Sequence, residues 1–319
     1  MKIIFFGSGY FSVPVLKKIL YSGNEILCVV TQPDKRKGRG WSVSPTPIKA
    51  FMEQTAPHIE LVQPISARDN SFYDYLSLKK ADLFVVVDYG QILSREVLSI
   101  PKLFCINLHP SLLPQYRGAS PINRAIQNGD NITGNTVIKM SIEMDAGEII
   151  TQENLSIQEG EDSITLFERL SQQGAGLLIK SIRSIEENKY TLTKQAEEKI
   201  SYAPKLKKQE GEINWEEPAE IILRKMKAFK PWPGIYTSMG NYTFKILNAR
   251  VHDVNNSGEP KGMLLTSADS GSMLIQTGNG IISLLFVQLE GKKAMSAEEF
   301  LKGHRLEKGL ILGHLKSIK

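Results

Sequence analysis

The sequence predicts two domains: an α/β domain with a doubly wound, mostly parallel sheet, and then a small β-barrel domain. The chain has 319 residues, which is more than a single hydrophobic core usually organises. Residues 1–190 contain continuous apolar runs of strand length, separated by segments long enough for crossover helices. After a polar, basic stretch, short β-rich runs punctuated by glycine follow, which is typical of a small barrel.

The first domain opens with a strand, a glycine-rich turn and a helix. Residues 3–6 are apolar and lead into Gly7-Ser8-Gly9, and apolar residues then recur on one face of a helix predicted over residues 12–21. Further strands are predicted at residues 26–30, 83–87, 104–108 and 136–142. Because these runs are continuous rather than alternating, the strands should be buried on both faces. A helix from Asp162 or Ser163 toward Tyr190 closes the domain.

A linker and a second domain follow this helix. Residues 194–208 are polar and basic, and Tyr202-Ala203-Pro204 is poorly suited to a regular helix. We therefore predict a first domain over residues 1–189, a linker over 190–208 and a second domain over 209–319. Strands of the second domain are predicted at residues 242–250, 273–277 and 281–289. Ser296 and Glu299 have the spacing of a capping box that opens a last helix.

Composition and charge limit the class of protein. The chain is 41% hydrophobic and 23% charged, as in ordinary globular proteins, and no apolar run has the length of a spanning helix or signal sequence. Cys28 and Cys105 lack the spacing of a metal site, so we expect a reducing, cytoplasmic location with no membrane and no metal. The net charge of +5 is small, but the basic residues are clustered, which indicates a polyanionic partner.

The glycine-rich turn departs from the pattern of a dinucleotide site. Gly7-Ser8-Gly9 continues into Tyr10-Phe11-Ser12, so the third glycine of the fingerprint is missing. No acidic residue clearly ends the next predicted strand, where a ribose would be held. We therefore expect no nicotinamide cofactor, neither NAD nor its phosphate.

Asn107 and His109 mark a candidate active site. They are two positions apart at the end of a predicted buried strand, so their side chains should point to the same face. Ligands of open α/β sheets bind at the carboxyl ends of the strands. An amide can donate to a developing oxyanion, and an imidazole can donate or move protons near neutral pH, which suits acyl transfer. The alternative is a His-Pro turn without a catalytic role.

Asp145 follows another predicted strand, in the loop Glu143-Met144-Asp145-Ala146-Gly147. Its carboxylate could orient His109 or help to remove the proton that an attacking amine must lose. Since an amine attacks an activated amide directly, the scheme requires no serine or cysteine nucleophile. An aspartate close to a glycine is also ordinary in loops, and that alternative stays open.

The same residues carry a resemblance to a known family. Asn107 and His109, followed by Ser-Leu-Leu-Pro and later by Met144-Asp145-Ala146-Gly147, resemble the signature of formyltransferases that use 10-formyltetrahydrofolate. The resemblance implies that Asn107, His109 and Asp145 are catalytic, that this folate is consumed as a co-substrate, and that the first domain is Rossmann-like and the barrel OB-like. It also implies folate contacts at Tyr89, Gly90, Gln91, Ile92, Leu93, Ser111, Leu112, Leu113 and Pro114.

Two basic segments resemble the branch of this family that formylates methionine on initiator tRNA. Between Pro33 and Lys49, five basic residues accompany one acidic residue, in a stretch that resembles the loop holding the acceptor arm. Residues 200–215 resemble the family's linker. The resemblance implies tRNA contacts at Lys35, Arg36, Lys37, Arg39, Lys205, Lys207, Lys208, Arg224, Lys225, Lys227 and Lys230, with Arg39 at the acceptor end. Without it, a solvated surface explains each of these residues equally well.

We therefore predict a monomeric enzyme that transfers the formyl group of 10-formyltetrahydrofolate to the α-amine of methionyl initiator tRNA. Asn107 and His109 would stabilise the oxyanion, and Asp145 and His109 would handle the proton. Three rival predictions remain. The first is a formyltransferase with a small amine acceptor, the second is a hydrolase that releases formate from the same folate, and the third is a tRNA-binding module without catalytic activity.

Overall fold

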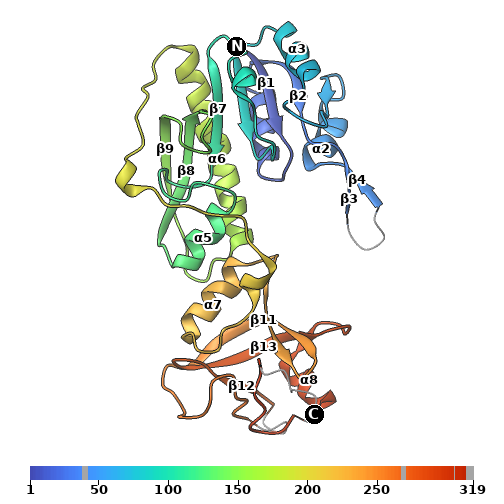
Figure 1. Cartoon of the computed structure of the whole chain (residues 1–319), viewed down its shortest axis with the longest axis vertical. Helices are drawn as coiled ribbons and strands as arrows, with labels where there is room; N and C mark the ends of the chain where they lie inside the picture. The colour runs from blue at the N-terminus through green and yellow to red at the C-terminus, as the bar shows by residue number, and fades with distance from the viewer. Residues whose placement is uncertain (38–41, 267–270, 305, 314–319) are drawn as a thin grey trace. The chain divides into compact units, whose positions relative to one another are not determined.

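The computed structural model describes residues 1–37, 42–266, 271–304 and 306–313 (Figure 1). The chain forms two compact units. The first unit consists of Met1–Pro121, Asn131–Ile157 and Thr165–Pro204. The second unit consists of Ile122–Asp130, Gln158–Ile164 and Lys205–Lys319. The domain limits expected at residues 189 and 209 stay predictions.

A seven-stranded sheet forms the centre of the first unit, in the order β5-β2-β1-β6-β7-β8-β9. Its strands are β1 (Lys2–Gly7), β2 (Glu25–Val30), β5 (Leu61–Val62), β6 (Leu83–Val87), β7 (Phe104–His109), β8 (Ile132–Lys139) and β9 (Ile149–Ser156). All neighbours from β5 to β7 pair in parallel, whereas β8 runs antiparallel to both β7 and β9. The five residues of β6 are all buried, as its continuous apolar run requires. The predicted doubly wound, mostly parallel sheet is confirmed.

The helices of the first unit each bury an apolar face. They are α1 (Ser12–Leu20), α2 (Pro47–Thr55), α3 (Asn70–Leu78), α4 (Arg95–Leu98) and α6 (Ser163–Glu186), whose residues from Thr165 on belong to this unit. In α1 the buried Val15 and Leu16 lie four and three positions before the buried Ile19, the spacing of one helical face. A separate ribbon of β3 (Lys35–Lys37) and β4 (Ser42–Ser44) stands away from the large sheet (Figure 1).

Two strands and one helix of the first unit differ from the sequence prediction by more than one residue. The strand expected at residues 136–142 begins at Ile132 and ends at Lys139, where the chain leaves the sheet for the loop that carries Asp145. Strand β9 was not expected, because most of its residues after Ile150 are polar and no continuous apolar run or apolar–polar alternation marks it in the sequence. The helix expected to reach Tyr190 ends at Glu186.

The second unit contains an antiparallel, barrel-like sheet in the order β10-β11-β13-β12, with β14 paired to β13. Its strands are β10 (Ile235–Met239), β11 (Tyr242–Asp253), β12 (Met273–Gln276), β13 (Ile281–Leu289) and β14 (Met295–Ser296), and its helices are α5 (Pro121–Asn128), α7 (Ala219–Ala228) and α8 (Ala297–Gly303). Phe244 of β11 and Phe300 of α8 pack in its core with ring centroids 5.2 Å apart. The predicted capping box is confirmed, since Ser296 Oγ accepts from the Glu299 amide at 3.1 Å.

Among the described residues, no helix combines the length and the apolar character needed to cross a membrane.

Candidate active site

Asn107 and His109 lie at the carboxyl end of β7, in the interior of the large sheet. Asn107 pairs with Val86 of β6 on one side and with Ile138 of β8 on the other. Since the two residues are two positions apart on an extended strand, both side chains point to the same face. His109 is buried, whereas Asn107 is half-buried and its side-chain amide bonds to no other described residue. This strand end therefore presents an amide whose two N–H donors are left unused by the described residues.

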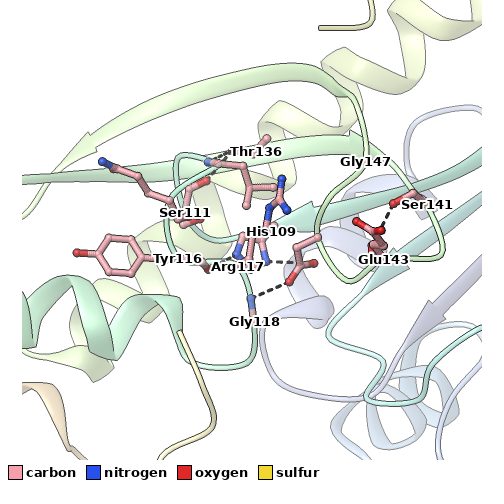
Figure 2. Close-up of polar contacts among 12 residues, drawn as sticks. His109, Ser111, Tyr116, Arg117, Gly118, Thr136, Ser141, Glu143 and Gly147 are labelled. Carbon is pink, nitrogen blue, oxygen red and sulfur yellow. Dashed lines mark hydrogen bonds and ion pairs between the residues drawn. The ribbon is translucent and has the colours of Figure 1, made fainter. Parts of the chain in front are cut away.

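The ring of His109 lies between a backbone carbonyl and a carboxylate (Figure 2). Its Nε2 is 2.9 Å from the carbonyl oxygen of Tyr116, and its Nδ1 is 3.6 Å from Oδ1 of Asp145. Because a carbonyl oxygen only accepts, Nε2 carries the proton of that hydrogen bond. A distance of 3.6 Å is too long for a hydrogen bond, so Nδ1 faces the carboxylate without being committed to it. The structure thus brings the predicted His109 and Asp145 together.

Asp145 is fixed by its own loop and by the loop that follows Tyr116. Its Oδ2 accepts a hydrogen bond from the amide of Gly118 at 2.9 Å. Its φ angle is +54°, in the left-handed region that non-glycine residues rarely adopt. A Cβ atom at Gly147 would lie 1.8 Å from the carbonyl oxygen of Lys139, so only glycine lets the loop pass so close to the end of β8. The fold therefore selects the conformation that aims the carboxylate at His109.

The turn after His109 is held from inside by buried polar groups. Ser111 is fully buried, and its hydroxyl donates to the carbonyl of Gln115 at 2.6 Å. Thr136 of β8 donates to the Ser111 carbonyl at 2.6 Å and accepts from the Leu113 amide at 3.1 Å. Gln152 of β9 donates to the Leu113 carbonyl at 2.7 Å. The Ser111 hydroxyl thus shapes the turn, while Leu112 and Pro114 keep some accessible surface, and folate contacts of residues 111–114 stay predictions.

The predicted folate loop of residues 89–93 is half in the core and half in solvent. Tyr89 and Leu93 are buried, and the Tyr89 ring packs edge-on against Phe6 at 5.5 Å. Gly90 and Ile92 are exposed, with Ile92 at 56%. The Gln91 side chain accepts from the Ala67 amide at 2.7 Å and so braces the neighbouring loop. Within residues 89–93, the exposed Gly90 and Ile92 are therefore the residues best placed to meet a ligand from solvent.

Asp88 directly follows β6 at the same edge of the sheet, and its backbone bonds to the first glycine-rich turn. Its carbonyl accepts from the amides of Ser8 and Gly9 at 3.0 and 3.2 Å, and its carboxylate accepts from the amide of Phe11. Although the residue keeps exposed surface, protein atoms closely surround the carboxyl group, and this desolvation raises its pKa to about 6. A carboxylate beside the start of α1 takes the place where a dinucleotide would put its pyrophosphate, which disfavours a phosphate ligand there.

The basic loop of the first unit has an ordered base. Lys49 pairs with Asp34 at 2.6 Å, and Gln63 also donates to Asp34, at 2.7 Å. Lys35 donates to the side chain of Gln32 at 2.7 Å, and Arg36 is exposed. Lys37 ends β3, and Arg39 lies outside the described residues.

The predicted tRNA-contacting residues of the second unit are not equivalent. Lys205, Lys207 and Lys208 are exposed. By contrast, Lys225 is paired with Glu217 through contacts of 2.5 and 2.7 Å, Arg224 lies 3.8 Å from Glu220, and Lys230 lies 3.1 Å from Asp162. Lys227 is half-buried on α7. Because a neighbouring carboxylate offsets part of their charge, Arg224, Lys225 and Lys230 present less net charge to a polyanion than the three exposed lysines do.

Sequence reasoning missed the groups that hold the two site side chains. The Tyr116 carbonyl and the Gly118 amide contact His109 and Asp145 through the backbone, so no residue type could have identified them. Thr136 lies in a predicted strand, but its bond to the 111–114 turn depends on the antiparallel pairing of β7 and β8. Gln195, from the predicted linker, also contacts the Asp145 loop.

No group of three or more histidine, cysteine, aspartate or glutamate side chains in the described part of the chain could hold a metal ion. Cys28 and Cys105 are both free and buried, and burial raises the pKa of the Cys28 thiol to about 11, so neither is poised as a nucleophile. The catalytic roles of the Asn107 amide, the His109 imidazole and the Asp145 carboxylate stay predictions.

Comparison with known proteins finds matches over both units. Residues 1–182 match a family model described as formyl transferase, and residues 205–305 match the model of the formyl transferase C-terminal domain. A methionyl-tRNA formyltransferase from Agathobacter rectalis is 40% identical over 310 residues, which cover 97% of this chain and 98% of the relative.

Solved structures share the fold at low sequence identity. The sugar 3N-formyl transferase WlaRD, solved in the presence of dTDP and 5-N-formyl-THF, is 20% identical with a TM-score of 0.65 and covers 92% of this chain and 99% of its own. HypX from Aquifex aeolicus, in complex with tetrahydrofolic acid, is 18% identical with a TM-score of 0.63 and covers 94% of this chain. This chain spans about half the length of HypX, 47%.

Proposed function

The chain belongs to the formyl transferase family, and we propose that it transfers the formyl group of 10-formyltetrahydrofolate to the α-amine of methionine carried by initiator tRNA. The acceptor follows from relatives named methionyl-tRNA formyltransferase that match almost the whole chain at 38 to 40% identity. The observation that carries the chemistry is the meeting of His109 and Asp145 beside the unused amide of Asn107. These groups suit attack on a carbonyl without a covalent enzyme intermediate.

The reaction requires an oxyanion to be stabilised and one proton to be moved. The amine nitrogen attacks the formyl carbon, a C–N bond forms, and the carbonyl electrons move to oxygen. Asn107 donates an N–H to this oxygen, and a protonated Nδ1 of His109, which is uncommitted to Asp145 at 3.6 Å, provides a second donor. Asp145 takes up the proton that the attacking nitrogen loses, and Nδ1 of His109 passes its proton to N10 of the folate as the bond between N10 and the formyl carbon breaks. Asp145 then returns a proton to Nδ1. Tetrahydrofolate then leaves.

The formyl donor is a reduced folate, as in the family, and we assign it to the 10-formyl form because N10 is a weakly basic aniline-type nitrogen, which leaves more readily from the formyl carbon than the more basic N5 does. The exposed Ile92 and Gly90 lie at the carboxyl edge of β6, next to the strand that carries Asn107. An apolar side chain and a free backbone are the groups expected to face a flat heterocycle. Residues 89–93 and 111–114 are therefore proposed to line the folate site.

The acceptor is a tRNA, and two basic segments are proposed to hold it. Lys35, Arg36, Lys37 and Arg39 are proposed to contact the acceptor arm, and the ion pair between Lys49 and Asp34 holds the base of their loop. The exposed Lys205, Lys207 and Lys208 are proposed to contact phosphates, more than the partly neutralised Arg224 and Lys225. Because charged initiator tRNA is used where translation takes place, we place the enzyme in the cytoplasm, acting as a monomer.

The function is tested by mixing the purified protein with 10-formyltetrahydrofolate and methionyl initiator tRNA and measuring N-formylmethionyl-tRNA. We expect turnover on the order of 1–10³ per second, the ordinary range for enzymes. Parallel reactions replace the tRNA by an amino sugar nucleotide or leave out any acceptor. Faster formylation of the small amine, or formate release at a comparable rate without an acceptor, would contradict the proposed acceptor.

The salt dependence of tRNA binding tests the proposed phosphate contacts. Replacing both Lys207 and Lys208 by alanine is expected to reduce the magnitude of the negative slope of log K against log salt by about two, because each phosphate contact contributes about one. The matched control combines Lys225→Met with Glu217→Gln, which removes the 2.5 Å ion pair and leaves the net charge unchanged. The control should keep the original slope, and an equal slope in the double lysine variant would remove these two residues from the interface.

A further inference from the structure

The side chain of Gln195 joins the two loops that hold the candidate active site. Its Nε2 donates to the carbonyl oxygens of Asp145 at 2.7 Å and of Gly147 at 2.8 Å. Its Oε1 accepts from Nε and Nη2 of Arg117 at 3.0 and 2.8 Å. Both amide hydrogens and both lone pairs of the acceptor oxygen are therefore used, which fixes the orientation of the side chain.

Arg117 lies between the two backbone groups that hold the proposed catalytic side chains. The preceding residue, Tyr116, offers its carbonyl to Nε2 of His109, and the following residue, Gly118, offers its amide to Oδ2 of Asp145. A bond from Gln195 to the Arg117 guanidinium therefore ties the Asp145 backbone to the same loop that Asp145 contacts through its carboxylate. The arrangement is a closed ring of hydrogen bonds around one aspartate.

The backbone of Asp145 needs such support. A φ of +54° is unfavourable for a residue with a Cβ, and residues in this region persist only when their surroundings determine them. The Asp145 carbonyl that Gln195 holds belongs to the peptide group directly after Asp145, and the Gly147 carbonyl belongs to the same loop two residues later, so the two bonds fix the loop on the C-terminal side of Asp145. Without those donors, the loop is free to relax to a commoner conformation and to withdraw the carboxylate from His109.

The segment around Gln195 is anchored on both sides within the first unit. Thr193 exchanges two backbone hydrogen bonds with Ile149 of β9, at 2.8 and 2.9 Å. Further on, the Ser201 carbonyl accepts from the Arg117 amide at 2.9 Å, and the Ala203 amide donates to the Arg117 carbonyl at 2.7 Å. Backbone hydrogen bonds that do not involve the Gln195 side chain therefore hold the segment that carries it.

We propose that Gln195 is a positioning residue for catalysis, which holds Asp145 in the conformation that faces His109. The proposal rests on the proposed function, because it gives Asp145 its role. Gln195 does not reach His109 or the unused amide of Asn107, so it acts through Asp145 alone.

Gln195→Glu tests the proposal, because a carboxylate can still bond to Arg117 but cannot donate to the two carbonyls. We expect kcat for formyl transfer to fall about 30-fold while KM for the tRNA and for the folate changes less than about threefold, since the loss is in transition-state stabilisation. Gln54→Glu is the matched control, because it makes the same change on an exposed side chain of α2. The control should keep the activity of the original protein.

A double-mutant cycle with Asp145→Asn distinguishes positioning from general stability. If Gln195 acts through Asp145, adding Gln195→Glu to Asp145→Asn should lower the single-turnover rate by less than about threefold further. An undiminished loss of about 30-fold in that background, or full activity of Gln195→Glu where Asp145→Asn is inactive, would overturn the proposal and leave the proposed function standing. Near-normal activity of Asp145→Asn alone would instead remove Asp145 from the mechanism and Gln195 with it.

The folded state of each variant is checked by its thermal unfolding and circular dichroism. Gln195→Met, which fills the same volume without any donor, serves as a second variant and should reproduce the kcat loss in a folded protein. If neither Gln195→Glu nor Gln195→Met folds, Gln195 is part of the structural core and the positioning role is overturned.

Discussion

Replacing Asp145 by asparagine is expected to lower kcat for formyl transfer by about 10³-fold, within the range of general acid–base contributions. The shape of the side chain is retained, and the asparagine carbonyl can still accept from the Gly118 amide, as Oδ2 of Asp145 does at 2.9 Å. The other terminal atom, now an NH₂ group, faces Nδ1 of His109. An N–H donor interacts favourably with an unprotonated Nδ1, whereas a carboxylate interacts favourably with a protonated Nδ1. The substitution therefore reverses which form of Nδ1 its neighbour favours.

Asp145→Asn therefore removes the oxyanion donor at His109 and, at the same time, the route by which Asp145 and His109 move the proton. An Nδ1 that accepts from the introduced asparagine amide carries no proton, so it cannot donate to the oxyanion or pass a proton to N10 of the folate, and asparagine cannot take up the proton of the amine. The measurement is steady-state formylation of methionyl initiator tRNA, with KM determined for both substrates. Glu143→Gln is the control, because it removes a negative charge from an exposed position of the same loop. Equal rates for Asp145→Asn and Glu143→Gln would show that the carboxylate has no part in catalysis.

The parts of the fold that follow from continuous apolar runs were predictable from sequence. Strands β1, β6 and β7 are buried on both faces along most of their length, so most of their residues are apolar and form the continuous runs that the sequence shows. Strand β9 is an edge strand whose accessible residues are polar, and its sequence resembles that of a loop. Its pairing to β8 is a tertiary property, which periodicity along one segment does not contain.

The residues of the candidate site also differ in how far the sequence predicts them. Asn107 and His109 stand out because polar side chains at the end of an apolar strand require an explanation beyond packing. Asp145 follows a predicted strand, but an aspartate in such a loop is ordinary, so the resemblance of its loop to a known family supports it more strongly than its position does. Gln195 lies 50 positions after Asp145, in a segment whose polarity predicts a linker. Motif spacing and composition do not reveal contacts that a side chain makes with backbone carbonyls so far away in the sequence.

Replacing Asn107 by alanine is expected to lower kcat by about 10² to 10³-fold, the usual cost of removing one oxyanion donor. The Asn107 amide bonds to no other described side chain or backbone group, so the substitution breaks no internal contact and should leave stability nearly unchanged. KM should change little, because the donor meets a full negative charge only in the transition state. Asn154→Ala, at an exposed position of β9, is the matched control.

Asn107→Asp distinguishes a donor from a residue that merely fills space. Aspartate has nearly the volume of asparagine, yet its carboxylate cannot donate and would place a negative charge beside the developing oxyanion. We therefore expect Asn107→Asp to be at least as impaired as Asn107→Ala, although it changes the side chain less. A rate for the aspartate variant near that of the original protein would mean that shape matters at this position and that the oxyanion is stabilised elsewhere. The order of the two variants thus assigns the role, because cavity formation and loss of a hydrogen-bond donor rank them in opposite ways.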